Sequence, residues 1–217
     1  MEKNSDPYQS FKSLIPFCEW IPEMLIGPIR RDGVQILKNL NVTRVLDLGC
    51  GTGSFCRLLA DASFAPIGLD PSPTMLARAS RKSSQEPRFS VVGGNGRRIP
   101  FRPGFDAVIL SLALHEMDPE IREEVWREMA RVLRPGGVCL LIDYALPEGK
   151  GWASRWWGAL TRMAEKKMEG VHPPHYLNYS GFMSAGALLP WVLARGGRIL
   201  EEHRYGGGNL TLLVIKR

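Results

Sequence analysis

The stretch VLDLGCGTG, residues 45–53, joins a short apolar run to three closely spaced glycines. A helical pattern follows it. Glycines at the carboxyl end of a buried strand let a ligand approach the backbone closely. The spacing is not that of the dinucleotide fingerprint GxGxxG, because Ser54 or Cys56 stands at the place of the third glycine. The stretch therefore predicts a strand, a ligand-binding turn and a helix.

Two acidic residues indicate what this turn would bind. Asp47 stands two residues before the first glycine, where its carboxylate would repel a pyrophosphate and attract a cation. Asp70 ends the next apolar run, 17 residues after Gly53, and an acid about 20 residues past such glycines can accept hydrogen bonds from ribose hydroxyls. Asp70 could instead merely cap the helix that would follow Pro71. The combination predicts a ligand with a nucleoside part and a positively charged part.

Short apolar runs alternate with helical stretches from residue 44 onward, which predicts an α/β fold with a doubly wound, parallel sheet. The expected strands cover residues 44–48, 66–69, 89–92, 106–111 and 138–142. Asp118-Pro119 is typical of a helix start, with Asp118 as the capping residue, and Leu133–Gly137 would turn the chain into the next strand. Two closing strands, 198–203 and 209–215, flank three glycines and predict an antiparallel edge pair.

Composition places the chain among ordinary globular proteins. It is 44% hydrophobic and 23% charged, and 28 Lys and Arg against 22 Asp and Glu give a net charge of +6. This excludes an acidic disordered chain but leaves nucleic acid, an anionic membrane or an anionic substrate as partners. The four cysteines have no CxxC spacing, the N-terminus has no signal-peptide pattern, and no apolar run is long enough to span a membrane. We therefore expect a reduced, cytoplasmic protein.

Residues 40–144 resemble the class I S-adenosylmethionine-dependent methyltransferases, and the closing strands do so more weakly. Five segments carry the resemblance, in order and at family spacing: residues 47–53, 67–71, 94–101, 105–115 and 132–137. The resemblance implies a Rossmann-like, seven-stranded, mostly parallel sheet whose last strand is antiparallel. It also implies S-adenosyl-L-methionine as the cofactor and S-adenosyl-L-homocysteine as its product.

The resemblance further implies which residues hold the cofactor. Asp47 and the glycines would hold its methionine portion, and Asp70 its ribose. Asn95 stands where the family usually has an aspartate that accepts from the adenine amino group, and its amide oxygen can also accept. Cys50 would be a small packing residue rather than a nucleophile. The full expected cofactor set is Asp47, Gly49, Cys50, Gly51, Gly53, Asp70, Pro71, Asn95, Gly96, Ser111 and Leu112.

Methyl transfer is an in-line displacement in which positioning supplies much of the acceleration, so these motifs do not guarantee a catalytic residue. Candidates must lie at the carboxyl ends of the strands. His115 follows the fourth strand and could act as a base, because the unperturbed pKa of histidine lies near neutrality. It could equally position the cofactor or pack beneath it. Asp143 and Tyr144 end the fifth strand and could orient an acceptor.

Residues 145–195 look like a helical cap inserted into the sheet. His172 and His175 raise the question of a metal, but Pro173-Pro174 argues against a regular helix and no third ligand is spaced nearby. We therefore expect no metal there, and a substrate lid or an ordinary surface loop instead. A second feature of the cap is an aromatic stripe at helical spacing, which would pack over the active site or contact a membrane or an apolar substrate. Its residues are Trp152, Trp156, Leu160 and Met163.

The segment after the fourth strand limits which classes of acceptor the sequence favours. It lacks the Asn/Asp-Pro-Pro-aromatic pattern of enzymes for exocyclic amines of nucleic acids and the Pro-Cys nucleophile of enzymes for cytosine carbon. Nucleic acid is therefore the less favoured partner. We expect one methyltransferase domain acting on a small, lipid-like or aromatic acceptor, as in quinone and phospholipid biosynthesis, with peripheral membrane contact. An RNA methyltransferase and a non-catalytic cofactor-binding protein remain the alternatives. The expected parts are an N-terminal helical lid (1–40), a cofactor-binding core (41–144), the cap (145–195) and the closing strands (196–217).

Overall fold

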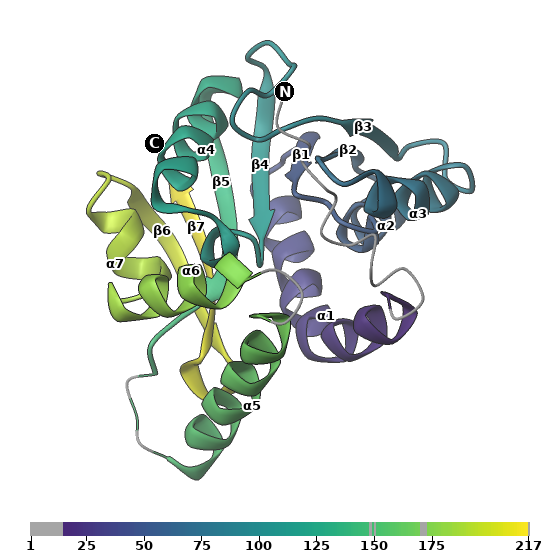
Figure 1. Cartoon of the computed structure of the whole chain (residues 1–217). Coiled ribbons are helices and arrows are strands. Elements are labelled where there is room, and N and C mark those ends of the chain that lie inside the picture. Colours follow the sequence, from purple (N-terminus) through teal and green to yellow (C-terminus); the bar gives the residue numbers. More distant parts are fainter. Residues whose placement is uncertain (1–14, 148, 150, 170–172, 217) are drawn as a thin grey trace.

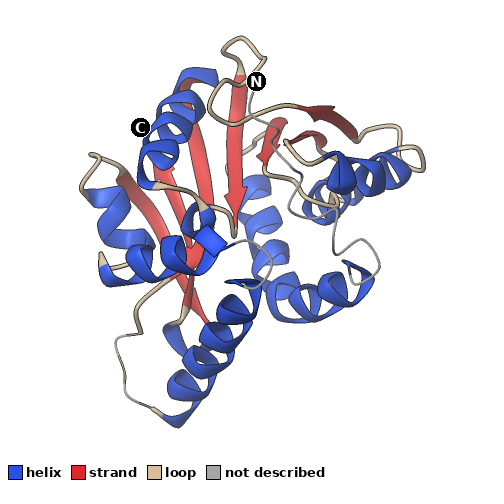
Figure 2. Cartoon of the chain, viewed as in Figure 1, coloured by secondary structure: helices blue, strands red, loops and turns tan. Residues whose placement is uncertain are grey.

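Seven strands form one sheet in the computed structural model, which describes residues 15–147, 149, 151–169 and 173–216 (Figure 1, Figure 2). Their order is β3-β2-β1-β4-β5-β7-β6. The strands are β1 (Arg44–Leu48), β2 (Ala65–Asp70), β3 (Ser90–Gly93), β4 (Phe105–Ser111), β5 (Leu133–Tyr144), β6 (Arg198–Tyr205) and β7 (Leu210–Lys216). Strands β1 to β5 pair in parallel, and β7 runs antiparallel to both β5 and β6. The predicted antiparallel pair is confirmed, with β6 forming the edge.

Helices cover both faces of this sheet, as the doubly wound prediction requires. They are α1 (Ile15–Asn39), α2 (Ser54–Asp61), α3 (Pro73–Ser83), α4 (Pro119–Val132), α5 (Trp152–Glu169), α6 (Pro173–Ser184) and α7 (Leu188–Leu193). The short turns η2 (Leu114–Glu116) and η3 (Gly206–Gly208) follow β4 and β6. The three glycines of η3 thus make the predicted reversal between the closing strands.

Neighbouring residues of β5 contribute to two separate apolar cores. Leu140 packs with residues of α1 and α2, including Ile29 and Phe55, on one face of the sheet. Leu141 packs on the other face, with residues of α4 and α7 that include Trp191. Successive side chains of a strand point to opposite faces, so a strand covered on both sides must be apolar throughout. This explains why the central strands appear in the sequence as continuous apolar runs.

Two predictions around α4 need correction. Asp118 is the residue before the helix and Pro119 is its first residue, but Asp118 makes no capping hydrogen bond. Its Oδ1 instead accepts a hydrogen bond of 2.9 Å from Nδ2 of Asn178 in α6. The segment Leu133–Gly137 is not a separate turn, because β5 already begins at Leu133, which pairs with Phe105 across a register irregularity.

The cap is tied to the core through Arg122 of α4. This buried guanidinium donates to the backbone oxygen of Leu114 over 2.7 Å and to that of Asn178 over 3.0 Å. It also lies 4.8 Å from the ring centre of Phe182 in α6. A buried charge needs such partners, so α6 is fixed against the turn that follows β4.

The prolines at the start of α6 correct another prediction. Pro173 and Pro174 open this helix instead of preventing it. Proline is tolerated in the first turn of a helix, because the backbone N–H groups there have no partner within the helix. His172 lies outside the described residues.

Only part of the expected N-terminal lid is described. Residues 1–14 lie outside the described part, and α1 follows as a bent helix with Pro22 and Pro28 in its interior (Figure 1). Interior prolines remove helical hydrogen bonds and bend helices. In the described part of the chain, no helix is both long and apolar enough to cross a membrane.

Candidate active site

The glycine turn after β1 depends on left-handed backbone angles. Gly49, Gly51 and Gly53 have φ values of +67°, +54° and +75°, which side-chain-bearing residues rarely adopt. A Cβ on Gly53 would also lie 2.6 Å from Cζ of Phe89, whereas a Cβ on Gly51 would meet no described atom within 4 Å. The turn is therefore packed at its end and open at its middle, where a ligand can reach the backbone.

Asp70 links this turn to the end of β2. Its Oδ2 accepts a hydrogen bond of 2.8 Å from the backbone N–H of Gly51, and its Oδ1 accepts one of 2.8 Å from Ser72. Ser72, not Asp70, caps α3, because its side chain accepts from the N–H of Met75 over 3.1 Å. The alternative that Asp70 is only a helix cap is thus wrong. Pro71 lies between these two anchoring residues.

Asp47 lies beneath the turn and is buried. Its Oδ2 accepts from the thiol of Cys56 in α2, with 3.2 Å between oxygen and sulfur. Burial raises the pKa of Asp47 to about 6, a rise that the Cys56 hydrogen bond and the charge of Arg30 oppose and that of Asp70 reinforces. Asp47 is therefore a carboxylate that is costly to ionise, and a nearby cation would lower that cost. Cys50 is buried too, and its sulfur would lie 2.7 Å from a Cβ on Gly68, which fits a packing role.

The other expected cofactor residues lie on neighbouring loops. The backbone N–H of Gly94 donates to the carbonyl oxygen of Asp70 over 3.1 Å, which brings the segment with Asn95 and Gly96 to the end of β2. The side chain of Asn95 is exposed, and its Oδ1 accepts from the N–H of Arg97 over 2.9 Å. This segment remains open to a ligand.

Ser111 ends β4, on the other side of β1, and Leu112 follows it. The Oγ of Ser111 is buried and has no hydrogen-bond partner among the residues that the structure describes. Leu112 adopts a left-handed φ of +53°. Buried polar atoms normally have partners, so the lone Ser111 hydroxyl fits a site that a polar ligand completes. The open glycine turn and this hydroxyl together are compatible with S-adenosylmethionine.

The glycine turn and the turn η2 adjoin at the point where the strand order reverses. Strand β1 lies between β2 and β4, and open α/β sheets bind ligands at such a point. The Cβ of Ala113 would lie 3.6 Å from a Cβ on Gly49. Ala113, the residue before η2, is therefore next to the glycine turn.

His115 of η2 is held by Asp143 at the end of β5. Its ring Nδ1 lies 2.7 Å from Oδ1 of Asp143, and both residues are buried. Oδ2 of Asp143 accepts from the backbone N–H of Leu114 over 3.0 Å and from that of His115 over 3.3 Å. Asp143 thus fixes both the ring and the backbone of His115, and it contacts the histidine rather than facing an acceptor directly.

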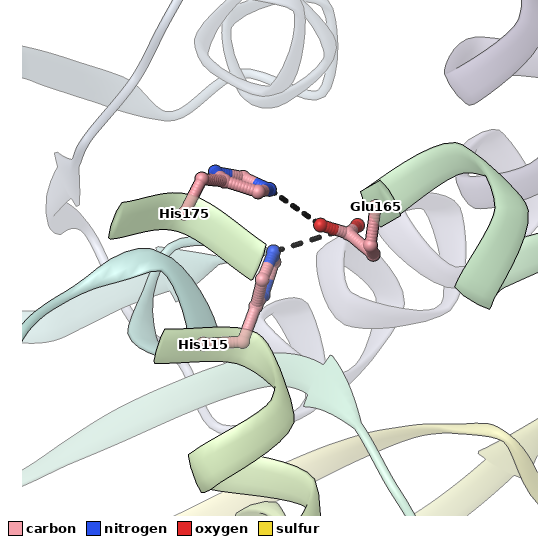
Figure 3. Close-up of side chains that lie close together, drawn as sticks. All are labelled: His115, Glu165 and His175. Carbon is pink, nitrogen blue, oxygen red and sulfur yellow. Dashed lines mark hydrogen bonds and ion pairs between the residues drawn. The ribbon is translucent and has the colours of Figure 1, made fainter. Parts of the chain in front are cut away.

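Glu165 and His175 complete this buried group, which we call the polar cluster: His115, Asp143, Tyr144, Glu165 and His175. Figure 3 shows His115, Glu165 and His175 pointing toward one another, with Glu165 on α5 and His175 on α6. Nε2 of His175 donates to Oε2 of Glu165 over 2.5 Å, and the Tyr144 hydroxyl donates to Oε1 over 2.5 Å. Nε2 of His115 lies 3.7 Å from Oε1 of Glu165. Residues far apart in the sequence thus form one site.

The charges within the cluster alter its pKa values. Burial disfavours a charged His115, but the charge and hydrogen bond of Asp143, with Glu165 and Glu116, raise its pKa to about 9. The value therefore lies well above the unperturbed one that suggested a base, and the ring carries a proton at neutral pH. Burial raises the pKa of Glu165, yet the hydrogen bond from His175 and the charge of His115 lower it overall. Burial and Glu165 both raise the pKa of Tyr144.

Sequence reasoning missed Glu165 and dismissed His175. Glu165 stands in the charged segment Ala-Glu-Lys-Lys, which is typical of a solvated helix face. A signal exists on the same helix, because Ser154, Gly158, Thr161 and Glu165 follow one another at spacings of three and four residues. Those residues form the inward face, while Trp152, Trp156 and Met163 are exposed. The inverted polarity of α5 indicates a polar site beneath it.

Comparisons with known proteins agree with this geometry. A family model described as "Methyltransferase domain" matches residues 45–137. An uncharacterized methyltransferase of Synechocystis sp. is 39% identical over 186 residues, covering 83% of this chain and 80% of that protein. A demethylmenaquinone methyltransferase of Beutenbergia cavernae is 37% identical over 105 residues, covering 48% of this chain and only 42% of that protein.

A solved structure supports the fold. It is an O-methyltransferase (NcsB1) from neocarzinostatin biosynthesis, in complex with S-adenosyl-L-homocysteine and 1,4-dihydroxy-2-naphthoic acid. It is 21% identical, has a TM-score of 0.66, and the match covers 97% of this chain and 58% of that one. The Synechocystis relative, the family model and the glycine turn agree with one another. The chain belongs to the class I S-adenosylmethionine-dependent methyltransferases.

Proposed function

We propose that the enzyme methylates a hydroxyl or an acidic carbon of a small aromatic or lipid-like acceptor. The observation that carries this proposal is the buried polar cluster beside the cofactor turn. An amine can attack a methyl group with its own lone pair, whereas a hydroxyl or an acidic carbon must lose a proton. A protonated imidazole held by carboxylates is suited to stabilise the anion that this loss leaves on the acceptor.

On the cofactor side, the chain's own groups have separable roles. Asp70 would accept from the ribose hydroxyls, and the open backbone at Gly51 would adjoin the methionine portion. Asp47 would favour the cationic cofactor through its charge, and Ser111 would provide a hydroxyl at the end of β4. Asn95, on its exposed loop, would accept from the adenine amino group. S-adenosylmethionine itself supplies the activated methyl group.

On the acceptor side, we infer that Asp143 is a positioning residue and His115 the group that meets the acceptor. Asp143 holds the ring through Nδ1, so Nε2 points to the centre of the cluster near Glu165. A charged imidazole there would stabilise the negative charge that develops on the acceptor. Tyr144 and His175 would hold Glu165 in place from two sides.

The outward face of α5 supports an amphiphilic acceptor and contact with a membrane surface. Trp152, Trp156 and Met163 are 83%, 57% and 71% exposed, and Leu177 of α6 is 73% exposed. The basic residues of α5, which are exposed as well, are Arg155, Arg162, Lys166 and Lys167. Exposed tryptophans among basic residues are typical of helices that lie on anionic lipid. The match to a demethylmenaquinone methyltransferase is consistent with this kind of acceptor.

The reaction can be tested with labelled cofactor. The purified chain is incubated with methyl-labelled S-adenosylmethionine and, separately, with lipid extract, a panel of phenols and quinols, RNA and a panel of amines. We expect label in the lipid extract or in the phenols and quinols, and mass spectrometry identifies the product. Label confined to RNA or to amines, or no transfer to any acceptor, would contradict the proposal.

Two substitutions test the cluster, and a third is their control. His115→Ala and Asp143→Asn should lower kcat by about 100-fold or more, the scale of lost general acid–base or electrostatic assistance. His203→Ala is the matched control, because His203 is an exposed histidine of β6 that lies 3.0 Å from Glu201. If His115→Ala kept full activity, the polar cluster would not be the acceptor site.

Membrane contact needs its own measurement. The variant Trp152→Ala/Trp156→Ala should bind anionic phospholipid vesicles at least about tenfold more weakly than the wild type, because it loses the apolar area that would insert. Leu193→Ala is the control, since Leu193 is 55% exposed on α7, outside the α5 stripe. Equal binding by both variants in a sedimentation assay would show that α5 is not the contact.

A further inference from the structure

We propose that His115, Glu165 and His175 form a binding site for one divalent transition-metal ion, with Zn²⁺ the best match. Each residue offers one ligand atom, and these atoms all lie within 4.8 Å of one another. The three side chains are buried and come from η2, α5 and α6 (Figure 3). Two histidines and a glutamate are a ligand set found at catalytic zinc sites.

The distances require only small side-chain movements. Bonds of about 2.0–2.2 Å in a tetrahedral zinc site place neighbouring ligand atoms roughly 3.4 Å apart. Nε2 of His115 lies 3.7 Å from Oε1 of Glu165, close to that value, whereas His175 contacts the other oxygen, Oε2, so a single-oxygen site also requires the carboxylate to rotate. Nε2 of His175 lies 2.5 Å from Oε2 of Glu165, which is a hydrogen-bond distance, so this pair must open by about 1 Å to admit an ion.

The surroundings of the three ligands resemble those of a metal site. Asp143 holds Nδ1 of His115 at 2.7 Å, which directs Nε2 toward the centre, and metal-bound histidines usually have such a carboxylate or carbonyl partner. The hydroxyl of Tyr144 donates to Oε1 of Glu165 over 2.5 Å and orients that carboxylate. These two contacts pre-arrange the ligands before any ion binds, and the ion would displace the proton that Nε2 of His115 carries at neutral pH.

The charge of the site also favours a cation. Asp143, Glu165 and Glu116 surround the two imidazoles, and Oε1 of Glu116 lies 3.8 Å from Nε2 of His115. A divalent ion balances such an excess of carboxylates within a small volume. His175 lies in the first turn of α6, directly after Pro173 and Pro174. It reaches the site because Arg122 holds α6 against η2.

Three protein ligands leave a tetrahedral ion one open position. The role of the bound ion rests on the proposed function: in place of the charged His115 ring, the ion would bind the acceptor's hydroxyl oxygen and promote loss of its proton to water. That oxygen then forms a bond to the methyl carbon, the carbon–sulfur bond breaks, and its electron pair stays on sulfur to give neutral S-adenosylhomocysteine. Binding of the ion itself does not depend on this role.

The test is a titration of the chelator-treated full chain with Zn²⁺, followed by competition with a chromophoric chelator. We expect one equivalent to bind, and Co²⁺ to give the visible absorption of a tetrahedral site without a thiolate charge-transfer band. A thiolate band would show that the ion binds the cysteines. That result would overturn the proposal, and so would one-to-one Zn²⁺ binding that is the same in His175→Ala as in the wild type.

Variants distinguish a metal site from a cluster that is held together by hydrogen bonds alone. Glu165→Gln and His175→Ala should each weaken Zn²⁺ binding by more than tenfold, and Asp143→Asn by roughly 10- to 100-fold, the usual effect of an outer-shell partner. His203→Ala should leave it unchanged. Circular dichroism and the Kd for S-adenosylmethionine confirm that each variant folds.

The metal site and the proposed function can fail independently. If the wild type binds no Zn²⁺ but methylates phenols or lipids, the metal site is wrong and the acceptor class stands. If it binds Zn²⁺ at these residues but methylates none of these acceptors, the metal site stands and the proposed function is wrong.

Discussion

Asp70 does more than its proposed ribose contact requires, because it also accepts from the backbone N–H of Gly51. Asp70→Ala should weaken S-adenosylmethionine binding by roughly 10- to 150-fold, the effect of losing a hydrogen bond to a charged group. Calorimetry measures the change. Asp61→Ala is the control, because Asp61 is an acid on α2 that pairs with Arg57 at the surface. An unchanged Kd in Asp70→Ala would contradict the assigned role.

Asp47 predicts how cofactor binding depends on pH. Its pKa is raised to about 6, so above pH 7 the carboxylate is charged and favours the cationic cofactor. Below pH 6 it becomes protonated in the free protein, and the affinity should fall by up to about tenfold per pH unit. The groups that face Asp47 are the thiol of Cys56 and the charges of Arg30 and Asp70.

The measurement for Asp47 is a calorimetric Kd at pH 7.5, 6 and 5, with circular dichroism to confirm folding at each pH. Asp47→Asn should bind more weakly than the wild type at pH 7.5 and should lose most of the decline toward pH 5. A wild-type Kd that stays constant from pH 7.5 to pH 5 would mean that Asp47 has no electrostatic role.

The sequence predicts an individual site residue when the residues that it contacts are close to it in the sequence. The glycines, Asp47 and Asp70 lie within one strand–turn–helix–strand unit, and their spacing alone predicts that they meet. His115 and Asp143 are detectable one at a time, because His115 follows the end of β4 closely and Asp143 lies at the end of β5. Glu165 is not, because it meets His115 only after α5 and α6 have folded over η2.

The turn between β1 and α2 offers a matched pair of glycines. Gly53→Ala forces an alanine into φ +75° and against Phe89, so it should destabilise the fold by more than about 1 kcal/mol. Gly51→Ala carries a similar φ of +54° but meets no described atom, so it should cost less stability and mainly impair cofactor binding. Chemical denaturation ranks the two variants. If Gly51→Ala were the less stable one, close packing would not be the reason for Gly53.

Helices and strands could be predicted from the sequence where a single hydrophobic pattern determines them. Strand β1 has the expected bounds, and the other parallel strands of the first half differ by only a residue at either end. The exceptions are local. Strand β5 starts early because Leu133 pairs directly with Phe105, and α6 exists because its prolines fall in the first turn. Both outcomes depend on tertiary partners that no local pattern contains.

Negative and positive charges lie in different parts of the molecule. The cofactor turn and the polar cluster are rich in buried carboxylates, Asp47, Asp70, Asp143 and Glu165. The net charge of +6 therefore comes from the surface, where α5 alone presents four exposed basic residues. An acidic interior suits a cationic cofactor, and a basic exterior fits the proposed contact with an anionic lipid surface. Composition alone could not separate these two effects.

The sheet and the cap are expected to unfold as one unit. Strand β5 pairs with β4 on one side and β7 on the other, and Arg122 and Glu165 tie the cap to this core. We therefore expect one cooperative thermal transition, with the near- and far-ultraviolet circular dichroism changing together. S-adenosylmethionine at 100 times its Kd should add about 2.7 kcal/mol and raise Tm by roughly 5–11 °C. NAD should cause no shift, because the turn disfavours a pyrophosphate. Two transitions, of which the cofactor moves only one, would instead show that the cap folds as a separate unit.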